Sequence, residues 1–358
     1  MKALIAAGGR ATRLRPITHT RNKHLIPIGG RPMIVYALEK LRAAGIREVY
    51  VNVNPGDSEM RKLLGDGSRW GMNVTVIEQT GGPQGVAHIL RGAKPYLQGE
   101  PFIFYLGDNI ILGDIKRFCD TFAAAKCNAL LAIAKVPDPQ RFGVPEFRDG
   151  KIIRVIEKPA HPPSEYAVTG IYVYDDHVFE AAENIQPSAR GEYEISDVHT
   201  WLIDHGYSVA HEEVTGWWKD TGKPEDLLHG NQLVLSDMRL EDATMEGLVG
   251  PEAVIQGRVR IGAGTRVEGK TLIRGPVTIG ENCLITGSYV GPYTSLGNGV
   301  RISETEIEHS IVLDHAELVS AGRLVDSLIG EYARVASTHA RRLSGHRMVI
   351  SDHSQVEI

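Results

Sequence analysis

Along residues 1–237, short apolar runs alternate with segments whose apolar residues recur at helical spacing. The apolar runs predict buried strands at residues 3–7, 49–53, 73–77 and 101–106. The helical pattern covers residues 32–45 and 85–94. Strands that alternate with helices predict a Rossmann-like α/β domain, with a mostly parallel sheet and helices on both faces. In such a sheet, ligands bind at the carboxyl ends of the strands.

Beyond residue 245 the apolar positions change to a period of six. They are Ile255, Ile261, Val267, Ile273, Ile279 and Ile285 and, after a slip of one residue, Val290, Leu296 and Ile302. This period fits neither a helix nor an amphipathic strand, and it is typical of a β-helix in which each short strand points one side chain inward. We therefore expect a left-handed parallel β-helix of hexapeptide repeats over residues 245–340. Because a stack of repeats needs its open end covered, residues 341–358 are expected to form a cap or tail.

Composition and charge argue against several classes of protein. The 358 residues, of which 42 % are hydrophobic, suffice for two domains with sizeable cores. A net charge of −5 without a basic run argues against a nucleic-acid partner. No apolar run approaches the length of a membrane span, and no N-terminal signal is visible. With three cysteines that lack metal-ligand spacing, the sequence predicts a cytoplasmic protein without a membrane partner.

The strand predicted at residues 3–7 leads into a glycine pair and then a basic loop. Gly8 and Gly9 let backbone N–H groups approach phosphate oxygens without interference from a Cβ atom. Arg13 and Lys23 add positive charge for a polyanion. The loop is neither a dinucleotide-binding fingerprint nor a Walker A loop, because the residues that complete those motifs are missing. The pattern therefore predicts a triphosphate-binding loop of another kind.

Two aspartates follow conspicuous segments of the chain. Asp108 lies in LGDN, directly after the strand predicted at 101–106, and Asp220 lies in GWWKDTG. Two carboxylates from distant segments could share a divalent cation, since Mg²⁺ takes one or two carboxylates together with substrate phosphates. The ordinary alternative for each is an aspartate that caps a helix or bonds to the backbone of its own turn.

The segment 8–33, GGRATRLRPITHTRNKHLIPIGGRPM, resembles the signature of the sugar-1-phosphate nucleotidyltransferases. The resemblance is strongest to the long members of this family, which have a C-terminal extension. It implies Mg²⁺-dependent transfer of a thymidylyl group from dTTP to glucose 1-phosphate, giving dTDP-glucose and pyrophosphate. Three positions depart from the signature. Ala11 replaces its third glycine, His24 replaces a glutamine and Arg31 replaces its second lysine.

The resemblance also implies roles for individual residues. The catalytic residues would be Arg13, Lys23, Asp108 and Asp220, and the two aspartates would hold Mg²⁺. The nucleotide-binding residues would be Ala7, Gly8, Gly9, Thr12, Arg13, Lys23, Gln79, Gly85 and Asp108. The sugar-phosphate-binding residues would be Asn109, Gly143, Glu157, Lys158, Val168 and Arg190. Lys23 would neutralise the α-phosphate and the attacking phosphate, and Arg13 would hold the phosphates that leave.

The residues leave several alternatives open. Thymine and uracil share the imide edge that Gln79 is expected to read, so a UTP-using uridylyltransferase fits as well. β-Helices also occur in acyltransferases, and His309 and His315 would then be candidates for a second activity in a bifunctional enzyme. A third possibility is a non-catalytic regulatory subunit of the same fold. The β-helix more plausibly serves assembly, so we expect a homo-oligomer.

Overall fold

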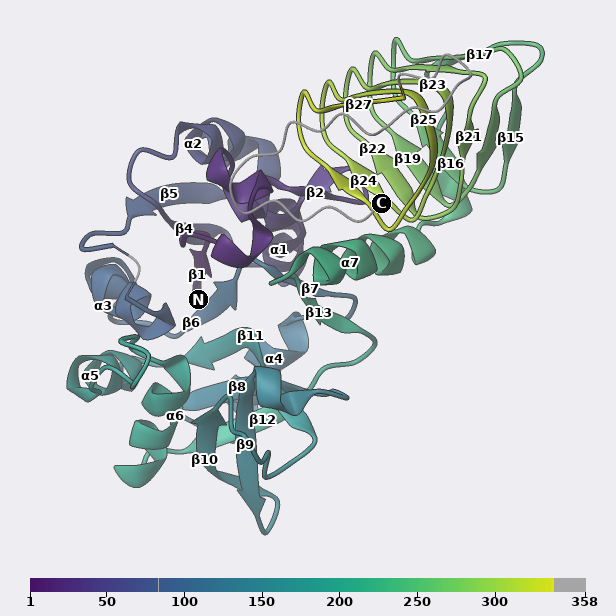
Figure 1. Cartoon of the computed structure of the whole chain (residues 1–358). Helices are drawn as coiled ribbons and strands as arrows, with labels where there is room; N and C mark the ends of the chain where they lie inside the picture. Colours follow the sequence, from purple (N-terminus) through teal and green to yellow (C-terminus); the bar gives the residue numbers. More distant parts are fainter. Residues whose placement is uncertain (83, 338–358) are drawn as a thin grey trace. The chain divides into compact units, whose positions relative to one another are not determined.

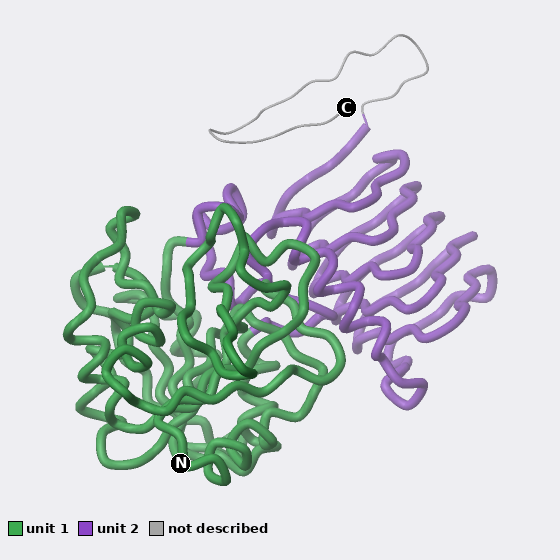
Figure 2. The backbone as a smooth tube through the Cα atoms, turned by 90° about the horizontal axis from the view of Figure 1, so that it is seen from below, with its two compact units in different colours: residues 1–10, 34–220 green, residues 11–33, 221–358 purple. Residues whose placement is uncertain are grey.

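The computed structural model describes residues 1–82 and 84–337. Its internal contacts divide the chain into two compact units, which are described separately below and are distinguished by colour in Figure 2. Unit 1 comprises Met1–Arg10 and Ile34–Asp220, and unit 2 comprises Ala11–Met33 and the chain from Thr221 onward. The N-terminal signature is therefore shared, with Gly8 and Gly9 in unit 1 and Arg13 and Lys23 in unit 2.

This division is one of internal contacts, and the domain boundaries that the sequence pattern suggests stay a prediction. The contacts group the first part of the signature with the α/β sheet and the remainder with the β-helix, whereas the pattern places the whole of residues 1–237 in one domain. The tail expected over residues 341–358 lies outside the described residues. In the described part of the chain, no helix is long and apolar enough to cross a membrane.

Unit 1 is built on a seven-stranded sheet with the order β12-β8-β11-β6-β1-β4-β5 (Figure 1). Its strands are β1 Lys2–Ala6, β4 Glu48–Val53, β5 Asn73–Glu78, β6 Phe102–Leu106, β8 Ala129–Lys135, β11 Tyr166–Tyr174 and β12 Val209–Glu213. Neighbouring strands pair in parallel except at β11, which is antiparallel to both β6 and β8. The expected mostly parallel sheet is confirmed, with β6 at its centre and β1 beside it.

Both faces of this sheet are covered. Among the described residues, six α-helices lie in unit 1, apart from the first residue of α1. They are α1 Met33–Ala43, α2 Ser58–Leu64, α3 Val86–Leu97, α4 Lys116–Ala125, α5 His177–Asn184 and α6 Ile195–Asp204. On the central strand β6, Phe102, Ile103, Phe104 and Tyr105 are all 0 % exposed, although their side chains alternate between the two faces. A strand that is apolar on both faces is typical of a parallel sheet between layers of helices.

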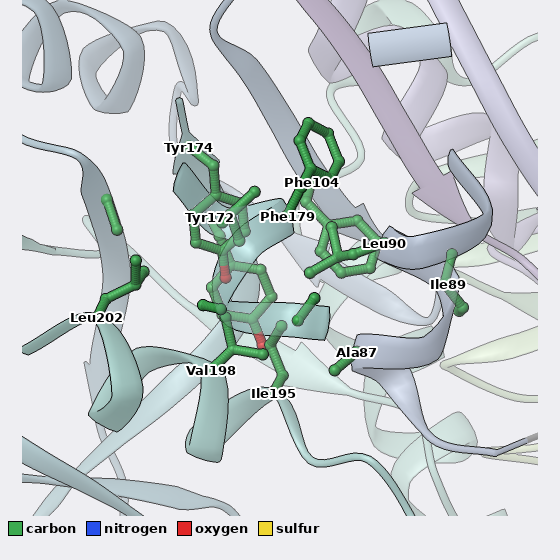
Figure 3. Packing of buried hydrophobic residues seen from close by; sticks show 14 of the residues in the cluster. Ala87, Ile89, Leu90, Phe104, Tyr172, Tyr174, Phe179, Ile195, Val198 and Leu202 are labelled. Atoms are coloured by element: carbon green, nitrogen blue, oxygen red, sulfur yellow. The ribbon is translucent and has the colours of Figure 1, made fainter. Parts of the chain in front are cut away.

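One hydrophobic core lies where α3, α5 and α6 meet the sheet. Figure 3 shows Leu90 of α3, Phe179 of α5 and Val198 of α6 packed around the aromatic residues of β6 and β11. The ring of Phe102 on β6 stacks on Phe179 with centroids 5.5 Å apart. Aromatic pairs in this geometry stabilise a core beyond the area that they bury. The core therefore fixes β1 and β6, whose carboxyl ends carry the residues discussed below.

Unit 2 contains the helix α7 (Pro224–Ser236), a short hairpin of β2 (Pro27–Ile28) and β3 (Arg31–Pro32), and a stack of parallel strands. These strands are β14 Leu248–Val249, β15 Val254–Gln256, β16 Val259–Ile261, β17 Arg266–Glu268, β18 Leu272–Arg274, β19 Val277–Ile279, β20 Leu284–Thr286, β21 Tyr289–Val290, β22 Thr294–Leu296, β23 Arg301–Glu308, β24 Ile311–Val312, β25 Glu317–Val325, β26 Leu328–Ile329 and β27 Arg334–Ala336. Each strand pairs in parallel with the equivalent strand of the next coil, as in β16-β19-β22-β24-β26.

The hexapeptide pattern is confirmed as the interior of a β-helix, consistent with the left-handed class. From Ile261 to Ile302, the apolar residues at the six-residue spacing are at most 2 % exposed. Ile255, in the first coil, is half-buried because only one neighbouring coil covers it. The repeat therefore builds one continuous core along the stack.

A buried histidine in unit 1 makes the stability of the protein depend on pH. His199 of α6 is 0 % exposed, and its Nε2 lies 2.6 Å from the Tyr174 hydroxyl. Its Nδ1 is buried without a hydrogen-bond partner. Burial lowers the pKa of His199 to about 3. In the unfolded chain, His199 has a pKa of about 6.5 and is protonated below that pH, whereas in the folded protein it stays neutral. The free energy of unfolding therefore falls as the pH falls below about 6.5.

We expect His199→Gln to reduce this loss of stability, because glutamine can accept the Tyr174 hydrogen bond but does not titrate. Between pH 6.5 and pH 4, the native protein should lose about 1.4 kcal/mol per pH unit more than the variant. Urea unfolding at a series of pH values measures this difference. His205→Gln, at the exposed end of the same helix, is the control. Equal pH slopes for the native protein and His199→Gln would contradict the prediction.

Candidate active site

The two candidate metal-binding aspartates lie in or next to a pair of neighbouring strands of unit 1. Strand β7 (Asn109–Ile111) pairs antiparallel with β13 (Trp218–Asp220), and Asp220 lies directly opposite Asn109. Asp108 immediately precedes Asn109, so the pairing brings two segments that are distant in sequence side by side. Both aspartates are half-buried. The structure thus brings together the two segments that carry these aspartates, and a shared metal site stays a prediction.

Asn109 holds this arrangement together. Its Oδ1 accepts hydrogen bonds from the Gly170 N–H at 3.0 Å and the Trp218 Nε1 at 2.7 Å. Its Nδ2 donates to Asp108 Oδ1 at 2.9 Å. The side chain is 3 % exposed, so Asn109 orients Asp108 from within the protein. Contact between Asn109 and a sugar phosphate stays a prediction, because the amide already bonds to three protein groups.

The electrostatics of this region are dominated by carboxylates. Burial raises the pKa of the Tyr172 phenol far above its ordinary value, and the charges of Glu157, Asp108 and Asp220 raise it further. All three carboxylates therefore act on one buried phenol of β11.

The residues present fit Mg²⁺ bound through two carboxylates. Mg²⁺ is commonly held by one or two carboxylates and substrate phosphates, with water completing the coordination. Among the described residues there is no group of three or more His, Cys, Asp or Glu side chains that could hold a metal. A cation at Asp108 and Asp220 would therefore take its other ligands from substrate or water.

Four of the expected sugar-phosphate residues lie at or contact the hairpin of β9 (Gly143–Arg148) and β10 (Lys151–Glu157), namely Gly143, Glu157, Lys158 and Arg190. Gly143 pairs with Glu157, whose carboxylate receives Lys158 Nζ at 2.6 Å and Arg190 Nη2 at 3.3 Å. Ser196 Oγ donates to the other oxygen of Glu157 at 2.8 Å. A Cβ at Gly143 would lie 2.5 Å from this Ser196 oxygen, so only glycine fits there.

Val168 differs from the other expected sugar-phosphate residues. It lies on β11 opposite Ile133 and is 8 % exposed within the core of unit 1. Its side chain packs with other apolar side chains, as its chemistry favours. A contact between Val168 and a sugar phosphate therefore stays a prediction.

The glycine pair after β1 contacts asparagine and glutamine side chains of unit 1. Asn54 forms two hydrogen bonds with Gly9, from the Gly9 N–H to Oδ1 and from Nδ2 to the Gly9 carbonyl, both at 2.9 Å. A Cβ at Gly8 would lie 3.1 Å from Gln79 Oε1 and 3.3 Å from Asn52 Oδ1. Phosphate contact at these glycines stays a prediction. Gly8 leaves room for amide side chains, and the Gly9 N–H already has an acceptor.

Other nucleotide-side residues line the same end of the sheet. Ala7 is 0 % exposed, and its N–H donates to the Asn52 carbonyl at 2.8 Å. Gln79 is 6 % exposed, with its Nε2 3.5 Å from His88 Nδ1. Gly85 has a φ of +103°, and a Cβ there would lie 2.5 Å from the Tyr193 carbonyl oxygen. Gly85 is therefore required by the backbone of residue 193, whether or not a base also contacts it.

The basic part of the signature is described within unit 2. Thr12 and Arg13 are exposed on a short 3₁₀ helix, Thr12–Leu14. Ala11 precedes them with a φ of 43°, in the left-handed region where glycine is ordinary. Its carbonyl accepts hydrogen bonds from the Leu14 N–H at 3.0 Å and the Thr18 hydroxyl at 2.7 Å. The missing glycine therefore leaves the left-handed turn in place. Lys23 is half-buried on a second 3₁₀ helix, Lys23–Leu25.

Comparison with known proteins assigns this arrangement to a family. The family model described as "Nucleotidyl transferase" matches residues 2–237. The chain belongs to the nucleotidyl transferase family. It is an enzyme of that class, and unit 1 with the signature loop lies within the matched residues.

Individual relatives agree with this assignment. The glucose-1-phosphate thymidylyltransferase of Streptomyces griseus is 41 % identical, over 100 % of this chain and 99 % of the relative. The low-salt glycan biosynthesis nucleotidyltransferase Agl11 of Haloferax volcanii is 40 % identical over 100 % of both chains. A crystal structure of a candidate glucose-1-phosphate thymidylyltransferase from Bacillus anthracis, in complex with sucrose, has a TM-score of 0.63 and 38 % identity. It covers 67 % of this chain and 96 % of that one.

The histidines considered for an acyltransferase activity lie on the β-helix of this nucleotidyl transferase. His309 Nδ1 bonds to the Asp326 carboxylate, and its Nε2 lies 3.1 Å from Gln232 Oε1. His315 stacks on Tyr332 with ring centroids 4.8 Å apart. Because both nitrogens of His309 have protein partners, this ring is arranged as a structural contact. An acyl transfer at His315 has no further support among its described contacts.

Two asparagines beside the signature, Asn52 and Asn54, were not predicted from the sequence as site residues. Asn52 and Asn54 stand in VNVNPG, at the carboxyl end of β4, which pairs with β1. Polar residues at the end of a buried parallel strand are a signal for this position. Asn54 holds Gly9, whereas the Oδ1 of Asn52 is buried without a hydrogen-bond partner. An acceptor left unpaired beside Gly8 is available to a donor on a bound molecule.

We expect Asn52→Leu to raise the free energy of unfolding of the nucleotidyl transferase. A buried acceptor without a partner costs about 1–3 kcal/mol, and leucine of similar size removes it. Asn54→Leu, two residues away, should instead lower stability because it breaks both bonds to Gly9. Urea unfolding without ligand compares the two variants. Equal destabilisation by both would contradict this account of Asn52.

Proposed function

We propose that this enzyme transfers a thymidylyl group from dTTP to glucose 1-phosphate, giving dTDP-glucose and pyrophosphate with Mg²⁺ as cofactor. The observation that supports the chemistry is the pairing of β7 with β13, which brings the segments that carry Asp108 and Asp220 side by side. The choice of substrates rests on full-length relatives named for that reaction. Transfer of a uridylyl group from UTP remains the alternative, because both bases present the same imide edge.

The reaction brings two polyanions together, so charge is the physical obstacle. A phosphate oxygen of glucose 1-phosphate attacks the α-phosphorus of dTTP in line, and pyrophosphate leaves. The attacking oxygen is already ionised, so catalysis depends on positioning and charge stabilisation rather than on a general base. Lys23 neutralises the α-phosphate and the attacking phosphate, while Arg13 holds the β- and γ-phosphates. Asp108 and Asp220 would hold Mg²⁺, which when bound would supply further positive charge to the phosphates.

The remaining residues would recognise the base and the sugar. Gln79 and Asn52 are both buried, and their amide oxygens beside Gly8 offer acceptors to the imide N–H of the base. On the sugar side, Glu157 would accept hydrogen bonds from hydroxyl groups. Arg190 and Lys158, which contact Glu157 in the structure, would meet the sugar phosphate.

We also infer a setting for the enzyme. Its three cysteines are free thiols, which fits a reducing compartment such as the cytoplasm. The regular coils of the β-helix fit association into a homo-oligomer, since stacked parallel strands present flat, repeated faces.

We expect Lys23→Ala and Asp108→Ala each to lower kcat by about two orders of magnitude or more, because each removes charge stabilisation at the reacting phosphates. Pyrophosphate release with dTTP, glucose 1-phosphate and Mg²⁺ measures kcat, and circular dichroism checks the fold. Lys62→Ala and Asp204→Asn, at exposed helical positions, are matched controls that should leave kcat unchanged. Turnover at the native rate in either site variant would rule out the assigned roles.

A panel of dTTP and UTP crossed with several sugar 1-phosphates tests the substrates. We expect the highest kcat/KM with dTTP and glucose 1-phosphate, because the full-length relatives carry that name. Higher kcat/KM with UTP would select the uridylyltransferase alternative. Absence of pyrophosphate release with every pair would favour a non-catalytic subunit.

A further inference from the structure

One buried asparagine in unit 2 joins the signature segment to the β-helix. Asn231 of α7 is 0 % exposed. Its Oδ1 accepts hydrogen bonds from the Gly29 N–H at 2.8 Å and the Ser295 hydroxyl at 2.7 Å. Its Nδ2 donates to the Tyr293 carbonyl at 2.9 Å. Three hydrogen bonds in a buried network fix the groups around Asn231, so Gly29 is held to the coil that contains β22.

The same glycine is held from its other side. Arg260 of β16 donates from Nη2 to the Gly29 carbonyl at 3.0 Å. The next residue, Gly30, packs so closely that a Cβ would lie 3.0 Å from both Arg260 Nη2 and Thr278 Oγ1. Both backbone polar groups of Gly29 are therefore bonded to α7 or the β-helix. The turn between β2 and β3 cannot shift without breaking these bonds.

A second attachment lies before Lys23 in the sequence. Arg21 Nη2 forms an ion pair with Glu331 Oε2 at 2.6 Å. Glu331 lies two residues after the end of β26. The Arg21 side chain is 17 % exposed, so the pair is partly shielded from solvent. Lys23 thus lies between two attachments to the β-helix, at Arg21 and at Gly29. Between them, the Ile26 N–H donates to the Lys23 carbonyl at 3.0 Å, which keeps the segment compact.

We propose that the β-helix positions the segment that carries Lys23, through Asn231 and Arg260 at one end and Glu331 at the other. The proposal rests on the phosphate-binding role assigned to Lys23 above. Asn231, Arg260 and Glu331 are positioning residues, because they act through the backbone of residues 21–30. The family model ends at residue 237, so Arg260 and Glu331 lie outside the matched part of the chain. In this enzyme the coils that carry Arg260 and Glu331 would therefore support the Lys23 segment, in addition to any part of the β-helix in assembly.

The expected effect is on turnover more than on substrate affinity. Displacement of a catalytic group by about 1 Å can reduce a rate by about a hundredfold. An interaction that acts in the transition state lowers kcat without a matching change in KM. Loss of an attachment should therefore reduce kcat while leaving the KM for dTTP nearly unchanged.

The test uses the full chain with Glu331→Ala, and Asn231→Leu as a second variant that replaces the buried amide with a side chain of similar size. We expect each to lower kcat about tenfold or more and to speed amide hydrogen exchange of residues 20–33 by about tenfold. Glu317→Ala is the matched control, because it breaks the Glu317–Arg334 ion pair of 2.8 Å within the β-helix. It should change neither kcat nor exchange in residues 20–33. If Asn231→Leu fails to fold, Arg260→Met takes its place.

Charge reversal provides a rescue. Arg21→Glu alone should lower kcat and speed exchange, and Arg21→Glu combined with Glu331→Arg should restore both toward the native values. Unchanged kcat and exchange in all single variants would overturn the proposal, as would equal effects from Glu317→Ala. Hydrogen exchange separates this proposal from the proposed function, because it reports the attachments even if dTTP and glucose 1-phosphate are not the substrates.

Discussion

The antiparallel pairing of β7 with β13 is the constraint on which the candidate active site depends. It joins residues 109–111 to residues 218–220 by backbone hydrogen bonds, and without it the segments that carry the two aspartates would be unrelated. Asn109 strengthens the pairing because its single amide bonds to Asp108, Gly170 and Trp218. Holding two carboxylates close together costs electrostatic free energy in the absence of a cation. The well-bonded frame offsets that cost and leaves a site suited to a divalent cation.

Close backbone packing gives the rest of the site its rigidity. At Gly8, Gly85 and Gly143, an added Cβ would meet protein atoms at 3.1, 2.5 and 2.5 Å. These glycines therefore bring separate segments of unit 1 into contact, from which amide and carboxylate side chains project. In unit 2, the bonds around Gly29 give the Lys23 segment a comparable support. Such preorganisation suits a reaction in which charges must be placed in advance of the chemical step.

Much of this organisation was accessible from the sequence. Period-six spacing identified the interior of the β-helix from Ile261 onward, because a repeat forces each inward side chain into an equivalent place. The segments containing Asp108 and Asp220 were found through their motifs, but the strand pairing that unites them involves contacts across more than a hundred residues, which no local pattern specifies. For the same reason the sequence missed Asn52, Asn54 and Asn231. The bond between Gly9 and Asn54 was likewise not foreseen, and phosphate contact at Gly9 stays a prediction. Val168 was predicted to bind the sugar phosphate because it lies in a family motif. In the structure its side chain belongs to the hydrophobic core of unit 1.

Metal binding tests the central claim most directly, because it requires neither the correct sugar nor turnover. The measurement is electron paramagnetic resonance of Mn²⁺, as a substitute for Mg²⁺, titrated into the full chain with dTTP present. If Asp108 and Asp220 share the cation, Asp108→Asn and Asp220→Asn should each weaken Mn²⁺ binding by at least about tenfold, while Asp204→Asn leaves it unchanged. Native Mn²⁺ affinity in both Asp108→Asn and Asp220→Asn would contradict the account.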